Sequence, residues 1–265
     1  MANGIYYPDS KAALTDLLSS WGLSKNSPAS GGQVILAPHG AWDLTGNIAA
    51  RAFVSVQKNR GRHSISRVLL FGTLHQAAPE GIYLSESAFF ETPLGDLKVD
   101  QRLNRKLSSC STIIRVNDIP HLSEHCLEIL LPLVKYCFPN ASIVPVLMSG
   151  AKAAHISSLA KSLKITIETF LEECLIIISS TVSQNFDPVI AYRMADEFRS
   201  LLEGMDPQSF LTRLAEGRIS ACGGALMGAL LESGLLEGKH FSALIPLAQG
   251  KGEQGETVYY GAFGA

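Results

Sequence analysis

The sequence predicts an α/β protein with a mostly parallel central sheet that helices cover on both faces. Short apolar runs rich in β-branched residues alternate with segments of helical periodicity, an alternation typical of α/β folds. These runs contain few polar residues, which is the pattern of strands buried on both faces. The expected strands are residues 33–37, 67–71, 112–116, 142–148 and 174–179.

Helices are expected before, between and after these strands. The first is an amphipathic helix that carries four apolar residues on one face: Leu14, Leu17, Leu18 and Trp21. Two later helices each begin with an Asp-Pro pair, at 187–188 and 206–207, in which the aspartate is a good N-cap and the proline suits the first helical position. With these two, the helices expected after the first are 46–57, 101–108, 123–137, 151–170, 188–202, 207–216 and 223–236.

The C-terminal part of the sequence has the pattern of strands and turns, without a helix between them. Residues 241–248 and 257–263 flank a glycine-rich turn, which predicts an antiparallel hairpin that completes the sheet. Gly250, Gly252 and Gly255 have the spacing of a dinucleotide fingerprint, but a strand and not a helix follows them, so we interpret them as a turn. We expect one domain over residues 1–265.

Composition and charge exclude several classes of protein. The net charge is −2, with 22 Lys and Arg against 24 Asp and Glu, so no strong field attracts nucleic acid. The longest apolar run has five residues, 174–178, far short of the roughly 20 that cross a membrane. The first ten residues lack a secretory signal, which predicts a cytoplasmic protein with free thiols. A small molecule or another protein is the expected partner.

Two histidines follow two expected strands at equivalent points. His39 comes two residues after strand 33–37, and His75 comes four residues after strand 67–71. Ligands bind where the carboxyl ends of parallel strands meet, so the two imidazoles can converge there. The pair predicts a metal site, whereas a single histidine of this kind would be interpreted as an ordinary loop residue.

Cys222 is a candidate third ligand. It opens the expected helix 223–236, whose dipole favours a thiolate over a thiol. Two imidazoles and a thiolate suit iron(II), copper or zinc and leave a position open for substrate or water. The alternative is that Cys222 is a small packing residue beside Gly223.

His125 is the candidate for proton transfer. Glu124 and His125 fall in the first turn of the expected helix 123–137, where the helix dipole lowers the pKa of an imidazole. A histidine there can act as acid or base toward a ligand at the sheet edge. In the alternative interpretation, Glu124 is an ordinary first-turn carboxylate.

Several ordered motifs together resemble the Memo family, nearly end to end. In chain order they are Tyr6-Tyr7-Pro8, Ala37-Pro38-His39, Gly72 to His75, Thr92-Pro93-Leu94-Gly95, Glu124-His125, Val144-Pro145-Val146-Leu147, Ser179-Ser180 and Cys222-Gly223. Memo proteins are similar in turn to the LigB-like class III extradiol dioxygenases, non-haem iron enzymes with a three-layer α/β/α fold. The resemblance implies that fold, and it makes His39, His75 and Cys222 the metal ligands, with iron(II) as the first expectation.

The resemblance also implies partners and further site residues. Microbial relatives are often encoded beside a radical SAM protein and an AMMECR-type protein, the AmmeMemoRadiSam system, in which this chain would be protein B. We expect His125 to be the catalytic residue that moves a proton. The substrate-binding residues are expected to be Tyr6, Trp42, Glu124, Thr181 and Gln184.

The chain departs from the family pattern after its last core strand. The family usually has Ser-Ser-Asp followed three residues later by His, where this chain has Thr181 and Gln184. Neither side chain titrates near neutral pH, which leaves His125 as the remaining base. Three hypotheses follow. The first is an iron-dependent, dioxygenase-like oxidoreductase of unknown substrate. The second is a non-catalytic, partner-binding protein that keeps the fold, and the third is a zinc hydrolase with the same ligands.

Overall fold

The centre of the molecule is a parallel block of four strands, β1 (Gln33–Ala37), β8 (Cys174–Ser179), β2 (Arg67–Thr73) and β7 (Ser142–Ser149), which pair in that order. Nearly all their residues are buried, which confirms the four predicted core strands to within two residues at each end. The computed structural model describes residues 3–25, 33–58, 64–252 and 254–265.

Short strands extend the block on both sides. β3 (Gly81–Leu84) pairs antiparallel with β7, and β6 (Ile114–Val116) pairs with β3. On the other side, β13 (Phe263–Gly264) pairs antiparallel with β1, and β10 (Ser242–Ala243) follows. The described residues thus form an eight-stranded mixed sheet in the order β10-β13-β1-β8-β2-β7-β3-β6.

Two strand predictions need correction. β6 was expected to be buried on both faces, but it is the last strand of the sheet, and two of its three residues are exposed. The predicted hairpin forms from β11 (Ala248–Lys251) and β12 (Thr257–Tyr260), but it pairs with β9 (Ser183–Asn185) in a separate three-stranded sheet. The ends of the two predicted strands do join the central sheet, where β10 and β13 pair with each other antiparallel.

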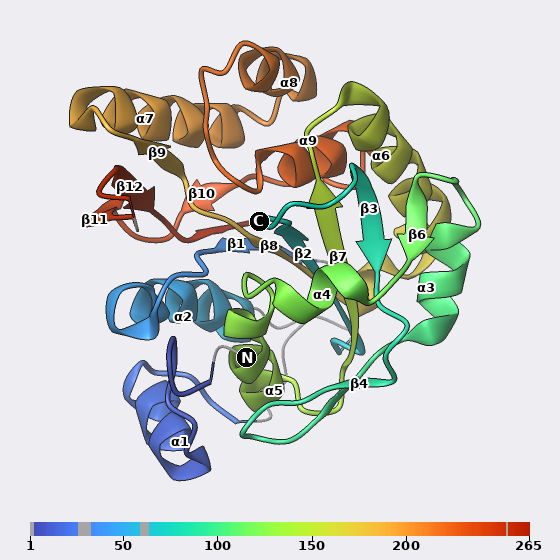
Figure 1. The fold of residues 1–265 in the computed structure, drawn as a ribbon, viewed down its shortest axis with the longest axis vertical. Helices are drawn as coiled ribbons and strands as arrows, with labels where there is room; N and C mark the ends of the chain where they lie inside the picture. Colours follow the sequence, from blue (N-terminus) through green and yellow to red (C-terminus); the bar gives the residue numbers. More distant parts are fainter. Residues whose placement is uncertain (1–2, 26–32, 59–63, 253) are drawn as a thin grey trace.

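Helices cover both faces of the sheet and make three layers (Figure 1). Alternate strand residues belong to different apolar clusters: Val34 and Leu36 pack into one, Ile35 and Ala37 into the other. The first cluster is covered by α3 (Gln101–Ser108), α6 (Ala153–Ile167), α7 (Pro188–Gly204), α8 (Pro207–Ala215) and α9 (Gly224–Glu232). The second is covered by α1 (Lys11–Ser20), α2 (Trp42–Lys58) and α5 (Leu131–Cys137). None of the helices in the described ranges combines the length and apolarity of a membrane span.

The predicted helix 123–137 is wrong in its first half. α4 (Ile119–Ser123) ends where that helix was expected to begin, and a 3-10 turn, η1 (Glu128–Leu130), precedes α5. Glu124 is extended, with φ −94° and ψ 124°. Its carboxylate accepts hydrogen bonds from the backbone N–H groups of His75 and Cys126, which tie this segment to the sheet edge.

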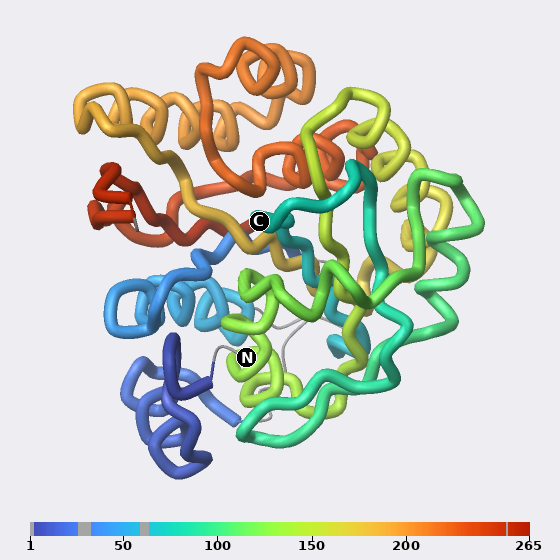
Figure 2. Tube along the Cα trace, viewed as in Figure 1, coloured from blue at the N-terminus to red at the C-terminus, as the bar shows by residue number. Residues whose placement is uncertain are grey.

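The N-terminal segment packs against a distant part of the chain. Figure 2 shows it beside the segment that contains α4 and α5. The hydroxyl of Tyr7 donates to Oε1 of Glu128, 121 residues later, over 3.4 Å. This packing brings the neighbouring Tyr6 to the carboxyl edge of the sheet, where the candidate site lies.

Candidate metal centre

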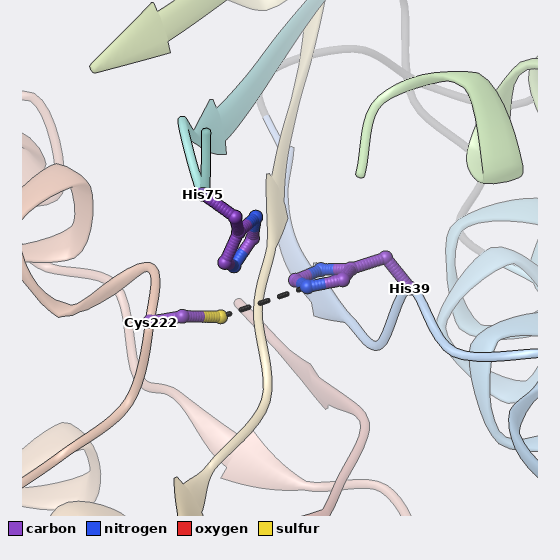
Figure 3. A group of neighbouring side chains, drawn as sticks. All are labelled: His39, His75 and Cys222. Carbon is purple, nitrogen blue, oxygen red and sulfur yellow. Dashed lines mark hydrogen bonds between the residues drawn. The ribbon is translucent and has the colours of Figure 1, made fainter. Parts of the chain in front are cut away.

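The three predicted ligands converge at the carboxyl edge of the parallel strands. The register aligns Leu36 of β1 with Ile178 of β8, and Ile178 with Phe71 of β2, so His39 and His75 leave the same edge only a few residues later. The ligand atoms of His39, His75 and Cys222 all lie within 4.8 Å of one another. Figure 3 shows the two imidazoles and the sulfur pointing toward one another, with Sγ of Cys222 at 3.8 Å from Nε2 of His39.

His39 is buried, and its ring is held by Ser179. The Ser179 hydroxyl donates its single proton to the carbonyl of Cys126 over 2.7 Å. Its oxygen must therefore accept from Nδ1–H of His39, which lies 2.8 Å away. This pair of hydrogen bonds selects the tautomer in which Nε2, the nitrogen that faces Cys222, carries the free lone pair.

His75 is held by Glu124, whose side chain is fully buried. One carboxylate oxygen accepts the backbone N–H of His75 at 2.6 Å, and the other lies 3.1 Å from Nδ1 of the ring. A carboxylate behind a histidine is the usual outer partner of a metal-binding imidazole, because it sets the ring orientation and the tautomer. Glu124 therefore orients the His75 ring and is not an ordinary first-turn carboxylate.

The pKa values of these groups favour a thiolate in the site. Burial alone would raise the pKa of Cys222, but His39 first, and then His75 and Thr181, hold it well below its usual value. Hydrogen bonds to Cys222 and Glu124 raise the pKa of His75 to about 10. Burial opposes ionisation of Glu124 as well, yet the hydrogen bonds from His75 lower its pKa to about 2. In the metal-free protein, Cys222 is therefore a thiolate beside a protonated His75, and a metal ion bound there would displace the His75 proton.

Cys222 is placed by the end of β8 and the start of α9. The sulfur accepts hydrogen bonds from the backbone N–H of Thr181 at 3.1 Å and from its hydroxyl at 3.4 Å. Gly223 donates its N–H to Ser180, and a Cβ at Gly223 would lie 2.7 Å from the Cβ of Ser180. Only a glycine lets the two segments approach so closely. Cys222 precedes the N-cap of α9, and the contacts described above stabilise its thiolate.

The structure separates the two positions at which the chain departs from the family pattern. Thr181 contacts the Cys222 sulfur, as described above. Gln184 is exposed in β9, where it pairs with Val258 of β12 and its backbone N–H donates to Ser220. Of the two, Thr181 is the one that the structure brings to the ligand set.

His125 and Tyr6 lie beside the two imidazoles. The His125 ring centroid is 6.1 Å from that of His75 and 6.4 Å from that of His39, and the ring stacks on Tyr6 at 5.0 Å. His125 thus lies near the centre as predicted, but the helical environment expected for it is absent, since α4 ends at Ser123.

Trp42, the other predicted pocket residue, occupies a core position. It is 3% exposed, it packs against Tyr7 and Trp21, and its indole N–H donates to the carbonyl of Ile129 over 3.1 Å. These contacts account for a tryptophan here, and a role in substrate binding stays a prediction.

A second group of metal-type side chains lies close by: His75, Glu124 and Cys126 also have ligand atoms within 4.8 Å. Both oxygens of Glu124 are already engaged by N–H groups. The Cys126 thiol donates to the carbonyl of Thr73 at 3.3 Å, and burial raises its pKa well above the usual value. The group is therefore a hydrogen-bond network that supports the first set.

The sequence analysis missed the supporting role of Ser179. The available signal was its position as the last residue of β8, level with Ala37 in the neighbouring strand. The Cys126 carbonyl, its other partner, had no signal in the sequence, because any residue there offers the same backbone group.

Comparisons with known proteins show the family of the chain. A family model described as Memo-like protein matches residues 1–257. A MEMO1 family protein of Metallosphaera sedula is 24% identical over 75% of this chain and 70% of its own length. One from Schizosaccharomyces pombe is 30% identical over 60% of this chain and 52% of its own.

A solved structure shows the same fold. The crystal structure of an uncharacterized protein from Escherichia coli K12 covers 88% of this chain and 98% of its own, with a TM-score of 0.58. Its sequence identity is 11%, so this likeness concerns the fold alone. The family match extends over nearly the whole chain, and on that ground the chain belongs to the Memo family.

Proposed function

We propose that His39, His75 and Cys222 bind one metal ion in a non-haem centre, and that the protein is an iron(II)-dependent, dioxygenase-like oxidoreductase of unknown substrate. The main support is the convergence of three ligand atoms within 4.8 Å, with each imidazole oriented by a buried partner. Two imidazoles and a thiolate fit iron(II), copper or zinc, whereas magnesium and calcium prefer oxygen ligands.

A bound metal would polarise a substrate or dioxygen. The residues around the metal would have different roles. His39 is 6% exposed and anchors the inner side, while the His75 side chain is 37% exposed and leaves the centre open to an incoming ligand. His125, next to both rings, is the group that would give or take a proton at that ligand.

One observation favours the second hypothesis, a non-catalytic partner-binding protein. Thr181, the departure that contacts Cys222, carries a hydroxyl that cannot take up a proton near neutral pH. Such a protein would keep the fold and the metal, and its partners in the AmmeMemoRadiSam system would be the radical SAM and AMMECR-type proteins.

The zinc hydrolase has weaker support. Its mechanism needs a carboxylate free to accept a proton from metal-bound water. Glu124 is the carboxylate next to the ligands, and its two oxygens already accept hydrogen bonds from His75 and Cys126.

Elemental analysis of protein purified anaerobically without chelator tests the proposal. We expect about one iron per chain in the unmodified protein and loss of most of it in His75→Ala, because two remaining ligands compete poorly with buffer. His240→Ala, at an exposed histidine, is the matched control and should keep its metal. Equal metal in His75→Ala would reject the centre, and zinc in place of iron would reject the oxidoreductase.

Dioxygen consumption by the iron-loaded protein separates the two main hypotheses. Uptake that depends on an added organic substrate and disappears in His75→Ala would support the oxidoreductase. Iron-loaded protein that reduces no dioxygen with any substrate of a broad panel would favour the partner-binding protein.

A further inference from the structure

The sulfur of Cys222 accepts two hydrogen bonds from a single residue, Thr181. The backbone N–H of Thr181 lies 3.1 Å from Sγ, and the Thr181 hydroxyl lies 3.4 Å from it. The N–H is present whatever residue stands at this position, whereas the hydroxyl depends on the side chain. Thr181 follows the last residue of β8 by two positions, and it is one of the two places where the chain departs from the family pattern.

The hydroxyl of Thr181 would still donate to the sulfur when the site holds a metal ion. The two imidazoles would then direct their lone pairs to the metal, so neither would donate to Sγ. The Ser180 hydroxyl lies 3.6 Å from Sγ, but its proton goes to the carbonyl of Thr181. Within the part of the chain that the structure describes, Thr181 therefore supplies the side-chain hydrogen bond to a metal-bound thiolate.

The backbone around Cys222 is fixed by other residues. The Cys222 carbonyl accepts a hydrogen bond from the Thr73 hydroxyl at the end of β2, and the following N–H, of Gly223, donates to Ser180. We therefore expect the sulfur to keep its place when the Thr181 hydroxyl alone is removed. The effect of the hydrogen bond can then be measured apart from an effect on the position of Cys222.

A hydrogen bond to a thiolate ligand changes the properties of the metal that the thiolate binds. The donor draws electron density from the sulfur, so the sulfur gives less negative charge to the ion. Less donated charge favours the lower oxidation state of the ion. Hydrogen bonds to sulfur ligands are one of the means by which proteins set the reduction potentials of their metal centres.

We propose that the Thr181 hydroxyl tunes the metal centre through Cys222: its hydrogen bond reduces the charge that the thiolate donates and raises the reduction potential of the bound ion. Thr181 contacts a ligand, so it is a positioning residue and not a catalytic one. The inference rests on the proposed metal centre but not on the identity of the substrate. It also gives the Thr181 side chain a role that needs no uptake of a proton.

The cobalt(II)-substituted protein reports this hydrogen bond directly. Charge transfer from the thiolate to cobalt needs more energy when a hydrogen bond stabilises the sulfur electrons. We expect the charge-transfer band of Thr181→Val to lie at longer wavelength than that of the unmodified protein. The band of Thr181→Ser should lie close to the unmodified position, because serine keeps the hydroxyl.

Thr212→Val is the matched control for the cobalt experiment. It makes the same replacement at an exposed threonine, whose hydroxyl donates to the carbonyl of Gln208 within α8. The band of this variant should not move. Thermal unfolding and metal content check that Thr181→Val and Thr181→Ser are folded and loaded.

Redox titration of the iron-loaded protein measures the consequence for the metal. At a fixed potential, we expect the ratio of ferric to ferrous iron to be about three- to tenfold higher in Thr181→Val than in the unmodified protein, the range for one lost hydrogen bond. Thr181→Ser should restore the unmodified ratio.

The outcomes separate this inference from the proposed centre. A band and a ratio that are the same in Thr181→Val as in the unmodified protein would overturn the role of Thr181 and leave the metal centre in place. Equal shifts in Thr181→Val and Thr181→Ser would also overturn it, because the hydroxyl would then not be the cause. Unmodified protein without a thiolate band would overturn the proposed centre and this inference with it.

Discussion

Ser179 accepts a hydrogen bond from Nδ1 of His39 at 2.8 Å, and this contact decides which nitrogen of His39 faces Cys222. The hydroxyl of Ser179 is itself held by the carbonyl of Cys126. Glu124 lies two residues before Cys126 in the chain, and its side chain accepts hydrogen bonds from His75. The segment 124–126 therefore sets the orientation of two imidazoles that come from different strands.

Ser179→Ala should weaken metal binding while leaving the fold intact. Without the hydroxyl, the His39 ring loses its hydrogen-bond acceptor, and loss of an outer partner of this kind reduces metal affinity by about 10- to 100-fold. Competition with a chelator of known affinity measures the change. Ser162→Ala removes a buried hydroxyl that bonds only within α6, to Ser158, and should keep the unmodified affinity. Equal affinities in the two variants would show that Ser179 does not position His39.

Cys222 should be alkylated faster than Cys126 and Cys174 in metal-free protein, and metal should protect it. Its pKa is held well below the usual value by His39, His75 and Thr181, whereas burial raises the pKa of Cys174 to about 12. Iodoacetamide labelling near neutral pH with peptide mapping measures the rates. Thr181→Val, which removes the hydroxyl donor, should slow labelling of Cys222. A Cys222 that labels no faster than Cys174 would contradict the thiolate.

Stability should fall in acid partly through His121. Its pKa is lowered from 6.5 to about 4 by burial. Between these values the unfolded chain binds a proton that the folded protein does not, so the free energy of unfolding decreases as the pH falls, by up to about 3 kcal/mol. Urea unfolding between about pH 4.5 and 7 should show a shallower decrease for His121→Gln. His240→Gln, at an exposed position, should follow the unmodified protein. Equal slopes for all three would show that His121 titrates normally.

Gly223→Ala should destabilise the protein and displace Cys222. The added Cβ would lie 2.7 Å from the Cβ of Ser180 and 2.9 Å from Cγ2 of Ile178, and overpacking of this kind costs about 1–3 kcal/mol. Denaturant unfolding and metal titration measure both effects. Gly204→Ala adds the same methyl group where no atom lies within 4 Å, so it should be close to neutral. A Gly223→Ala variant with normal stability and metal affinity would refute the close approach.

The sequence predicted the part of the site that depends on strand order. Four buried strands were recognisable from their apolar, β-branched runs, and a parallel sheet brings its carboxyl ends together whatever the exact order. His39 and His75 were located in this way. The antiparallel β3 was missed, because four residues are too few to show a period.

The features of the site that the sequence did not predict depend on contacts between residues distant in the sequence. Residues 124–127 have the composition of a helix start, and local propensity alone favours continuing into α5. The hydrogen bonds from His75 and Cys126 to Glu124 override that propensity, and one of them comes from a residue 49 positions away. The pairing of Gln184 with β12 is likewise set by the C-terminal hairpin.

The most direct test of the three-ligand centre is the spectrum of the cobalt(II)-substituted protein, because a thiolate bound to cobalt gives an intense near-ultraviolet charge-transfer band. We expect this band to saturate at about one cobalt per chain, to vanish in Cys222→Ser and to persist in Cys110→Ser, which changes an exposed thiol. We also expect His39→Ala and His75→Ala to weaken cobalt binding. A band that survives in Cys222→Ser, or a binding curve that is unchanged in both histidine variants, would contradict the centre.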